Sequence, residues 1–377
     1  MIADRSGPRR GALHGGPRCV AARDVVRRAV TRRSSMTRDE CDVMGKIGHR
    51  PAERQLAYTF GGRIPVAHLR SGDVLEVYTE DCFGGRLRSA TDLSSWMLET
   101  PHLNPVSGPF LIEEAEPGDT LAIHIVSVVP ARDWGVSSTP PHIGALGTGV
   151  RALALGAPVE ARVWFYEIDR RAGTVRFQST RTDHAVDLPL APTIGTIGVS
   201  PGRLEARSTM VPDFYGGKLD IPEARAGATL YLGVNVHGAM LALGDGHARQ
   251  GHGQACPAGV AIATVTTVAI EVIKGWQTSW PRLETDLDLM SIGCARPLDD
   301  AYRIAHQDLV SWVGSLAGLE MLDAHQLVSQ AGRTALGNVR DANYTLLAAI
   351  GRRLVPHPAA AYDDAHDRLK RTAASAG

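Results

Sequence analysis

The chain has 377 residues, of which 44% are hydrophobic and 21% are charged, and its formal net charge at pH 7 is zero. This balance gives no electrostatic reason to expect a nucleic acid or a membrane as a partner, and no run of about 18 apolar residues is present to span a bilayer. The 40 glycines and 22 prolines are spread along the chain, which favours short strands joined by tight turns and excludes a helical bundle.

Residues 1–50 differ from the rest in being rich in Arg, Gly and Ala, and they contain no apolar segment of the kind that a secretory signal needs. We expect a disordered extension there. The five cysteines are odd in number, far apart and free of CxxC pairs, which indicates reduced thiols rather than a disulfide scaffold or a thiolate zinc site. Together these features predict a cytoplasmic protein.

One short pattern, a glycine turn followed by alternating apolar residues, occurs three times, in residues 71–77, 117–123 and 226–232. The alternation is typical of strands with one buried face. Residues 162–177 predict a hairpin, and the Val- and Thr-rich residues 260–273 predict one long strand. The three copies are irregularly spaced, which favours strands of sandwich or barrel subdomains over a solenoid.

Only the C-terminal part of the sequence has the apolar spacing of helices, over residues 299–314 and 323–332. The last residues are polar, and we expect a frayed tail over residues 361–377. The predicted organisation is therefore the extension over residues 1–50, one main domain over residues 51–360 whose helices begin near residue 299, and the polar tail.

The common signatures of nucleophilic, phosphate-binding and zinc-protease sites are absent, because the sequence has no G-x-S-x-G, no P-loop and no H-E-x-x-H. Residues 244–249 begin like a dinucleotide fingerprint, but Arg249 stands where the last glycine should be and no helix pattern follows. We therefore expect no nucleotide cofactor.

Residues with catalytic side chains concentrate instead in the segment Gly244-Asp245-Gly246-His247, which we interpret as a glycine-rich loop, and in His252 shortly after it. Asp245 and His247 are two residues apart, so in an extended strand end they share one face. A carboxylate and an imidazole together can bind a divalent metal or form an acid/base pair. The alternative is a turn in which Asp245 caps backbone amides and His247 is solvated.

Three other glycine turns carry a polar residue at their edge, and the pattern alone leaves each open between a site and an ordinary loop. These residues are Asp220 in Gly216-Gly217-Lys218-Leu219-Asp220, Asp81 in Asp81-Cys82-Phe83-Gly84-Gly85, and Asn104 in Asn104-Pro105-Val106-Ser107-Gly108-Pro109.

Taken in order, these segments resemble the acetamidase/formamidase family, whose cytoplasmic members hydrolyse short amides to a carboxylate and ammonia. The resemblance covers residues 55–355 and depends on the order and number of its pieces. It implies a mainly β fold of jelly-roll or β-sandwich-like subdomains with small α/β additions and C-terminal helices, and often a homo-oligomer. Its main pieces are Ser71-Gly72-Asp73, Asn104-Pro105, Glu114-Ala115-Glu116-Pro117-Gly118-Asp119, Gly195-Thr196-Ile197-Gly198-Val199, Gly216-Gly217 with Asp220, and Gly244-Asp245-Gly246-His247 with Gln250-Gly251.

The resemblance implies a small linear amide as the substrate. Our first hypothesis is that Asp245 and His247, with Asp220 and His252, orient a metal or activate water for attack on the carbonyl carbon. Members of the family have been associated with zinc or calcium, so we expect a divalent metal on Asp245 and His247. The expected substrate-binding residues are Asn104, Asp81 and Gln254.

The chain departs from the family pattern close to His247. Lys218 stands where the family has Asn, and acidic positions are replaced by His252, Gln254 and Ala263. Because Gln and Ala cannot take a proton from water, the second hypothesis is a degenerate member that binds a small ligand with weak or no amidase activity. Alternatively, His252 replaces the lost base, since imidazole exchanges protons near neutral pH.

Overall fold

The computed structural model describes residues 46–97, 102–141, 143–146, 160–340, 342–356 and 362–375. The chain divides into two compact units, Met1–Val43 and Met44–Gly377, and all of these residues belong to the second. Up to residue 45, the expected extension therefore lies outside the described residues. The expectation of disorder is wrong for its last part, because Lys46–His49 forms strand β1 and pairs in parallel with a strand of the main domain.

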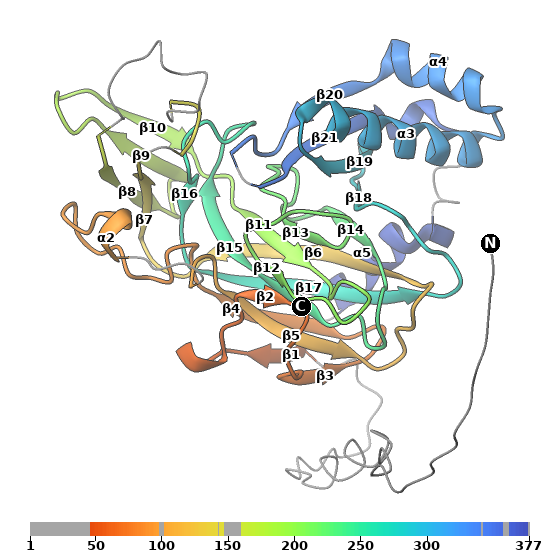
Figure 1. The fold of residues 1–377 in the computed structure, drawn as a ribbon, viewed down its shortest axis with the longest axis horizontal. Helices are drawn as coiled ribbons and strands as arrows, with labels where there is room; N and C mark the ends of the chain where they lie inside the picture. The colour runs from red at the N-terminus through yellow and green to blue at the C-terminus, as the bar shows by residue number, and fades with distance from the viewer. Residues whose placement is uncertain are drawn as a thin grey trace, which may run out of the picture. The chain divides into compact units, whose positions relative to one another are not determined.

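Nine strands of the described part form one sheet, which is antiparallel except where β1 joins it (Figure 1). The long strands at its centre carry the Val- and Ile-rich segments of the sequence, which suit a pleated buried surface. In spatial order the strands are β1, β4 (Val74–Thr79), β17 (Thr264–Ile273), β6 (Thr120–Pro130), β14 (Thr229–Gly233), β18 (Arg282–Glu284), β19 (Asp288–Ala295), β21 (Tyr344–Gly351) and β20 (Arg333–Leu336).

A second sheet contains the strand of the Gly-Asp-Gly-His segment, β15 (Leu241–Arg249). In spatial order this sheet runs β10 (Ala185–Pro189), β9 (Thr174–Gln178), β8 (Arg162–Asp169), β7 (Trp134–Thr139), β16 (Val260–Ala261), β15, β11 (Thr193–Gly198) and β13 (Gly216–Lys218). Two strands lie off this path, β5 (Val106–Ile112), which pairs with β15, and β3 (Ala67–Leu69), which pairs with β5. A separate small pair is β12 (Arg207–Ser208) with β2 (Thr59–Phe60).

Side chains from both sheets form one buried cluster, so the two sheets pack as a sandwich. The alternation along β14 shows how one strand serves two layers: Leu230 and Leu232 belong to this cluster, whereas Tyr231 belongs to a second cluster on the other face of the first sheet. Helices cover that other face, and Leu309 and Val328 of two of them pack there.

The helices that cover the sheet lie near the C-terminus, as the sequence predicts, with α3 and α4 beside β19 and β21 (Figure 1). Among the described residues no helix is long and apolar enough to cross a membrane. The helical elements are α2 (Ser94–Met97), α3 (Leu298–Ala317), α4 (Met321–Ala331) and α5 (Ala365–Ser375), with 3-10 turns η1 (Glu53–Gln55) and η3 (Arg352–Leu354).

The mainly β fold with C-terminal helices is confirmed, and so are the three glycine-turn strands and the hairpin. The three glycine-turn patterns become the entries of β4, β6 and β14, and their glycines Gly72, Gly118 and Gly227 have φ of 95°, 101° and 89°. A left-handed φ strains other residues, which explains why glycine recurs there. The hairpin of β8 and β9 also forms where the sequence predicts it.

Three expectations need correction. Residues 260–273 are not one strand: β16 pairs in the second sheet and β17 in the first, so the chain changes sheets at Ile262. The Gly-Asp-Gly-His segment is not a loop but the interior of β15, between β11 and the strands β5 and β16. The tail is not frayed, because α5 buries Ala365 and Leu369 against the first sheet.

Candidate active site

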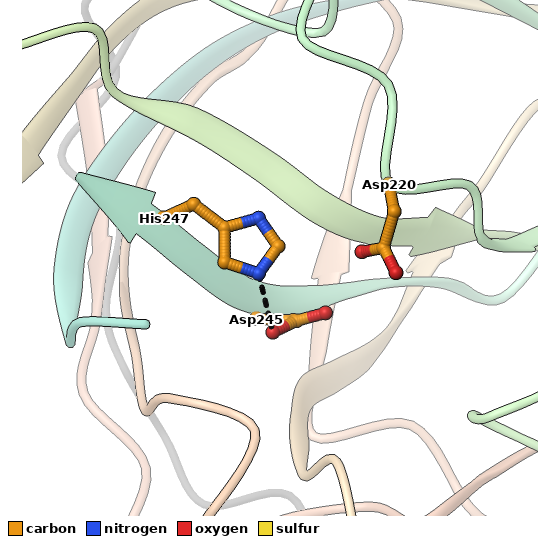
Figure 2. Close-up of side chains that lie close together, drawn as sticks. All are labelled: Asp220, Asp245 and His247. Carbon is orange, nitrogen blue, oxygen red and sulfur yellow. Dashed lines mark ion pairs between the residues drawn. The ribbon is translucent and has the colours of Figure 1, made fainter. Parts of the chain in front are cut away.

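Asp245, His247 and Asp220 come together in the second sheet, as Figure 2 shows. Asp245 and His247 are both on β15, and Asp220 follows β13, on the other side of β11. One ligand atom of each of the three side chains lies within 4.8 Å of the others, and all three residues are fully buried. The predicted alternative of a solvated turn is therefore wrong, and the shared face of Asp245 and His247 is confirmed.

The cluster fits against the backbone of Gly195 on β11, which lies between the strands that carry it. A Cβ atom at this position would come within 2.6 Å of Asp220 Oδ1 and within 2.7 Å of both Asp245 Oδ2 and His247 Cε1. Real Cβ atoms do not approach so closely, so the glycine makes room for the cluster.

Backbone strain coincides with the predicted site residues. Asn104, Asp220, Asp245 and Gln254 all have positive φ, between 40° and 59°. Asn and Asp tolerate this conformation better than most residues, but it still costs free energy, and such residues cluster at active sites and ligand clamps. Seven other described non-glycine residues also have positive φ, so the strain is compatible with a functional role here and does not by itself identify the site.

Lys218, the last residue of β13, completes the cluster. Its Nζ donates to Asp245 Oδ2 and lies 3.3 Å from Asp220 Oδ1, and its side chain is 1% exposed. Thr196 also donates to Asp245 Oδ2, at 3.2 Å, and Asn104 Nδ2 donates to Thr196 Oγ1 at 3.0 Å. Asn104 thus acts on the cluster through Thr196.

The two carboxyl groups have different proton affinities. Burial alone would raise the pKa of Asp245, but the charges of Lys218 and His247 hold it well below its ordinary value. Burial raises the pKa of Asp220, and the opposing charges of Lys218 and Arg340 reverse only part of this rise. Neighbouring acids whose pKa values are pushed apart can divide the roles of proton donor and proton acceptor.

Arg340 joins the cluster from a distant part of the sequence. Its Nη2 lies 3.3 Å from Asp220 Oδ2, and its Nε donates to Gln254 Oε1 at 2.9 Å. Gln254 in turn donates to Gln250 Oε1 at 3.3 Å, and Gln250 donates to the backbone oxygen of Asp220. Gln254 is therefore part of the surroundings of Asp220, as a hydrogen-bonding group.

Two side chains of the cluster keep polar atoms available. His247 Nε2 lies 3.2 Å from Asp245 Oδ1, but neither atom makes a well-oriented hydrogen bond within the described residues, and the same is true of His247 Nδ1. Buried polar atoms nearly always have partners, so these atoms have the capacity for hydrogen bonds that the described residues do not supply.

A pocket of about 210 Å³ reaches the cluster from the side of Lys218. Its walls are mostly apolar, and its polar lining includes Lys218, Arg340 and Cys82. Asp220, Asp245 and His247 do not line it and lie behind Lys218. A larger groove of about 590 Å³ between α3 and α4 has no acidic residue in its described lining, so we place the chemistry at the smaller pocket.

Two predicted residues have other roles in this structure. His252 is not brought to the cluster: its side chain is 54% exposed and its Nε2 lies 2.8 Å from Glu223 Oε1. Asp81 is buried, but Oδ1 accepts from the backbone N–H groups of Phe83 and Gly85, and Oδ2 pairs with Arg132. Asp81 therefore shapes the turn that brings Cys82 and Phe83 to the pocket wall.

The expected divalent metal does not fit the cluster as it stands. Asp220, Asp245 and His247 are the right kinds of ligand, but Lys218 already lies between the carboxylates and Arg340 contacts Asp220. A divalent ion would have to share buried carboxylates with two cations, which is electrostatically unfavourable.

Sequence reasoning did not assign Lys218, Arg340 and Cys82 to the site. Lys218 had a signal, since a lysine between a double glycine and an acid in an otherwise apolar strand is unusual. Arg340 had no such signal. Only the three-dimensional fold brings it to Gln254 and Asp220, which lie 86 and 120 positions earlier in the sequence.

Comparison with known proteins finds relatives of this chain. The model of the Acetamidase/Formamidase family matches residues 62–203 and 194–345. The crystal structure of an acetamidase from Yersinia enterocolitica is 38% identical, with a TM-score of 0.77 over 83% of this chain and 94% of that one. That of an acetamidase from Bacillus halodurans is 29% identical, with a TM-score of 0.72 over 82% of this chain and 98% of that one.

A curated relative from Schizosaccharomyces pombe, named "Putative formamidase C869.04", is 25% identical over 271 residues. The match covers 56% of this chain and 62% of that protein, so the chain spans less than two thirds of the relative's length.

Proposed function

Because the chain belongs to the acetamidase/formamidase family, we propose that it hydrolyses the carbon–nitrogen bond of small linear amides and releases a carboxylate and ammonia. The observation that carries this proposal is the meeting of Asp220, Asp245 and His247 behind Lys218, which lines an apolar pocket. Buried acid, base and cation groups next to an apolar pocket are the usual composition of a hydrolytic site.

The cations suit the oxygen atom of the amide. When water adds to the carbonyl carbon, negative charge develops on that oxygen, and a fixed ammonium or guanidinium group in a dry pocket stabilises it. Lys218 and Arg340 line the pocket. We assign to them the binding of the carbonyl oxygen.

The Asp245–His247 pair suits the proton transfers. His247 has two ring nitrogens without hydrogen-bond partners among the described residues, and its Nε2 lies 3.2 Å from Oδ1 of Asp245, whose pKa is held well below its ordinary value. We propose that this pair takes the proton of the attacking water and that the proton then passes to the amide nitrogen, which leaves as ammonia. No step uses a metal.

Ammonia release from formamide and acetamide by the purified full-length protein tests the proposal. We expect His247→Ala to lower kcat/KM by at least about 100-fold, the contribution typical of a general base. His237→Ala is the matched control, because His237 is 62% exposed and pairs with Glu116 at the surface. Equal activity of His247→Ala and the wild type would rule out this role of His247.

A second candidate is a ligand-binding protein without turnover. It is favoured by the lack of any exposed surface on Asp220, Asp245 and His247, and by the ion pairs that occupy both carboxylates. Calorimetric titration with acetamide and propionamide separates the two: binding without ammonia release across the amide series supports the second candidate, and turnover removes it.

The expected cytoplasmic location, the expected homo-oligomer and the expected absence of nucleic-acid and membrane partners remain part of this proposal. Sedimentation of the purified protein measures the number of subunits.

A further inference from the structure

Two of the three side chains that could share a metal ion, Asp220 and Asp245, already share an ammonium group. Lys218 Nζ contacts Asp245 Oδ2 and lies 3.3 Å from Asp220 Oδ1. Because these carboxylates and His247 present ligand atoms within 4.8 Å of one another, the ammonium lies where the two carboxylates converge.

Too few ligand atoms are left for a metal. Arg340 holds the second oxygen of Asp220, so the atoms of the group without a hydrogen bond in the described structure are Asp245 Oδ1 and the two ring nitrogens of His247. One imidazole gives one ligand to a given ion, so these atoms supply two ligands at most. Zinc takes three or four protein ligands and calcium takes six to eight oxygens. A metal could complete its coordination here only if Lys218 moved away.

The charges already balance within the described cluster. Two carboxylates face the cations Lys218 and Arg340. A divalent ion would add two positive charges at a place with no exposed surface, and a buried charge without a counter-charge is strongly unfavourable.

The backbone holds Lys218 in place. Lys218 pairs with Thr196 in the ladder between β13 and β11, and its carbonyl oxygen accepts from Asn338 Nδ2 at 3.1 Å. The side chain is 1% exposed. With the backbone fixed, moving the ammonium out of the cluster would separate a buried charge from both of its carboxylates.

We propose that Lys218 is the resident cation of this cluster, that it occupies the position a divalent metal would need, and that the protein acts without a bound metal. The statement about activity rests on the proposed function, whereas the statement about metal content does not.

Zinc and calcium binding by four forms of the full chain tests the inference: the wild type, Lys218→Ala, His247→Ala and the double variant. After dialysis against a chelator, each is titrated by calorimetry. The wild type and His247→Ala should bind equally, because metal bound elsewhere does not depend on His247. Lys218→Ala should bind about one more equivalent of metal, because the freed carboxylates and His247 form a three-ligand site. The double variant, which lacks His247, should not bind this extra equivalent. Lys46→Ala, whose lysine is 50% exposed, should match the wild type.

Lys218→Ala removes the ammonium from the buried Asp245 and leaves Asp220 with Arg340 alone, so the variant can be unstable. Lys218→Gln is the second variant, and a thermal midpoint that rises with added zinc in either variant, but not in the double variant, supports the inference. If neither variant folds, the comparison of the wild type with His247→Ala decides alone. A His247-dependent equivalent of metal in the wild type overturns the inference, and so do folded Lys218 variants that gain none.

The activity readout separates this inference from the proposed function. A wild type that releases ammonia should keep its rate within about twofold after chelation, since no step uses a metal. A loss of rate that zinc restores overturns the inference. If the wild type has no amidase activity and binds no His247-dependent metal, the proposed function is wrong, but the assignment of Lys218 as the resident cation still holds.

Discussion

Gly195 leaves room for three side chains at once, since a Cβ atom there would come within 2.7 Å of Asp220, Asp245 and His247. We expect Gly195→Ala to lower kcat/KM for a small amide by about 100-fold, because a displacement of about 1 Å at reacting groups has this effect. The added methyl should also lower the free energy of unfolding by about 1–3 kcal/mol through overpacking. Steady-state ammonia release and urea unfolding measure the two effects.

Gly48→Ala is the matched control, because a Cβ atom there meets nothing within 4 Å and, as at Gly195, φ lies outside the left-handed region. The control separates the loss of space at Gly195 from the general effect of replacing a strand glycine. Unchanged activity of Gly195→Ala would show that the cluster can shift without loss of activity. The proposal that catalysis depends on the exact positions of its side chains would then be wrong.

Local pattern was enough to identify Asp245 and His247 as neighbours, because residues two apart on a strand share one face. It could not place His252 or Arg340. His252 follows the end of β15, where the face of a residue is no longer set by the strand, and it pairs with Glu223 instead. Arg340 reaches Asp220 through long-range packing, which no local spacing encodes.

At the scale of elements, α5 packs on the first sheet over a pair of buried histidines. His124 of β6 and His366 of α5 both contact Thr229 Oγ1, at 2.9 and 2.7 Å. Burial, together with the nearby His366 and Lys370, lowers the pKa of His124 to about 4. Folding therefore favours the neutral ring of His124.

The sign of the pH effect follows from this shift. Above pH 6.5 the ring is neutral in both the folded and the unfolded chain. Between pH 6.5 and about 4 the unfolded chain binds a proton that the folded chain does not, so the free energy of unfolding falls through this window. The shift corresponds to a loss of about 3 kcal/mol, at about 1.4 kcal/mol per pKa unit.

We expect His124→Gln to remove most of this loss, measured as the difference in unfolding free energy between pH 7 and pH 4.5. Comparison with the wild type is needed because Glu284, whose pKa burial raises to about 7, changes stability in the opposite direction over the same window. The same slope in both proteins would contradict the assignment to His124.

The elements themselves were predictable where one face of a strand or helix is buried, as in β14 and α3. The sequence could not separate β16 from β17, because both are apolar and the step between sheets at Ile262 is set by pairing partners elsewhere. It also underestimated α5, since a mostly polar helix buries only a narrow stripe that includes Leu369.

At the scale of the whole domain, the site joins the two sheets. Lys218, Asp245 and His247 belong to the second sheet, whereas Arg340 follows β20 of the first. Arg340 is 6% exposed on its side chain and holds both Asp220 and Gln254. Its contacts therefore couple the packing of the sheets to the position of an acid in the cluster.

We expect Arg340→Leu to lower the free energy of unfolding by about 3 kcal/mol, because removing one partner of a buried ion pair leaves the other charge uncompensated. Arg333→Leu, on β20 itself, is the matched control: Arg333 is 65% exposed and its ion pair with Asp288 should contribute at most about 1 kcal/mol. Urea unfolding of both variants gives the two values.

Arg340→Lys tests whether charge or shape matters more. Lysine keeps the positive charge, but it lacks the planar group that reaches Asp220 and Gln254 together. If geometry positions Asp220, Arg340→Lys should recover most of the stability and little of the amidase activity. Recovery of both stability and activity in Arg340→Lys would mean that Arg340 acts through its charge alone. If Arg340→Leu loses no more unfolding free energy than Arg333→Leu, other contacts hold the two sheets together.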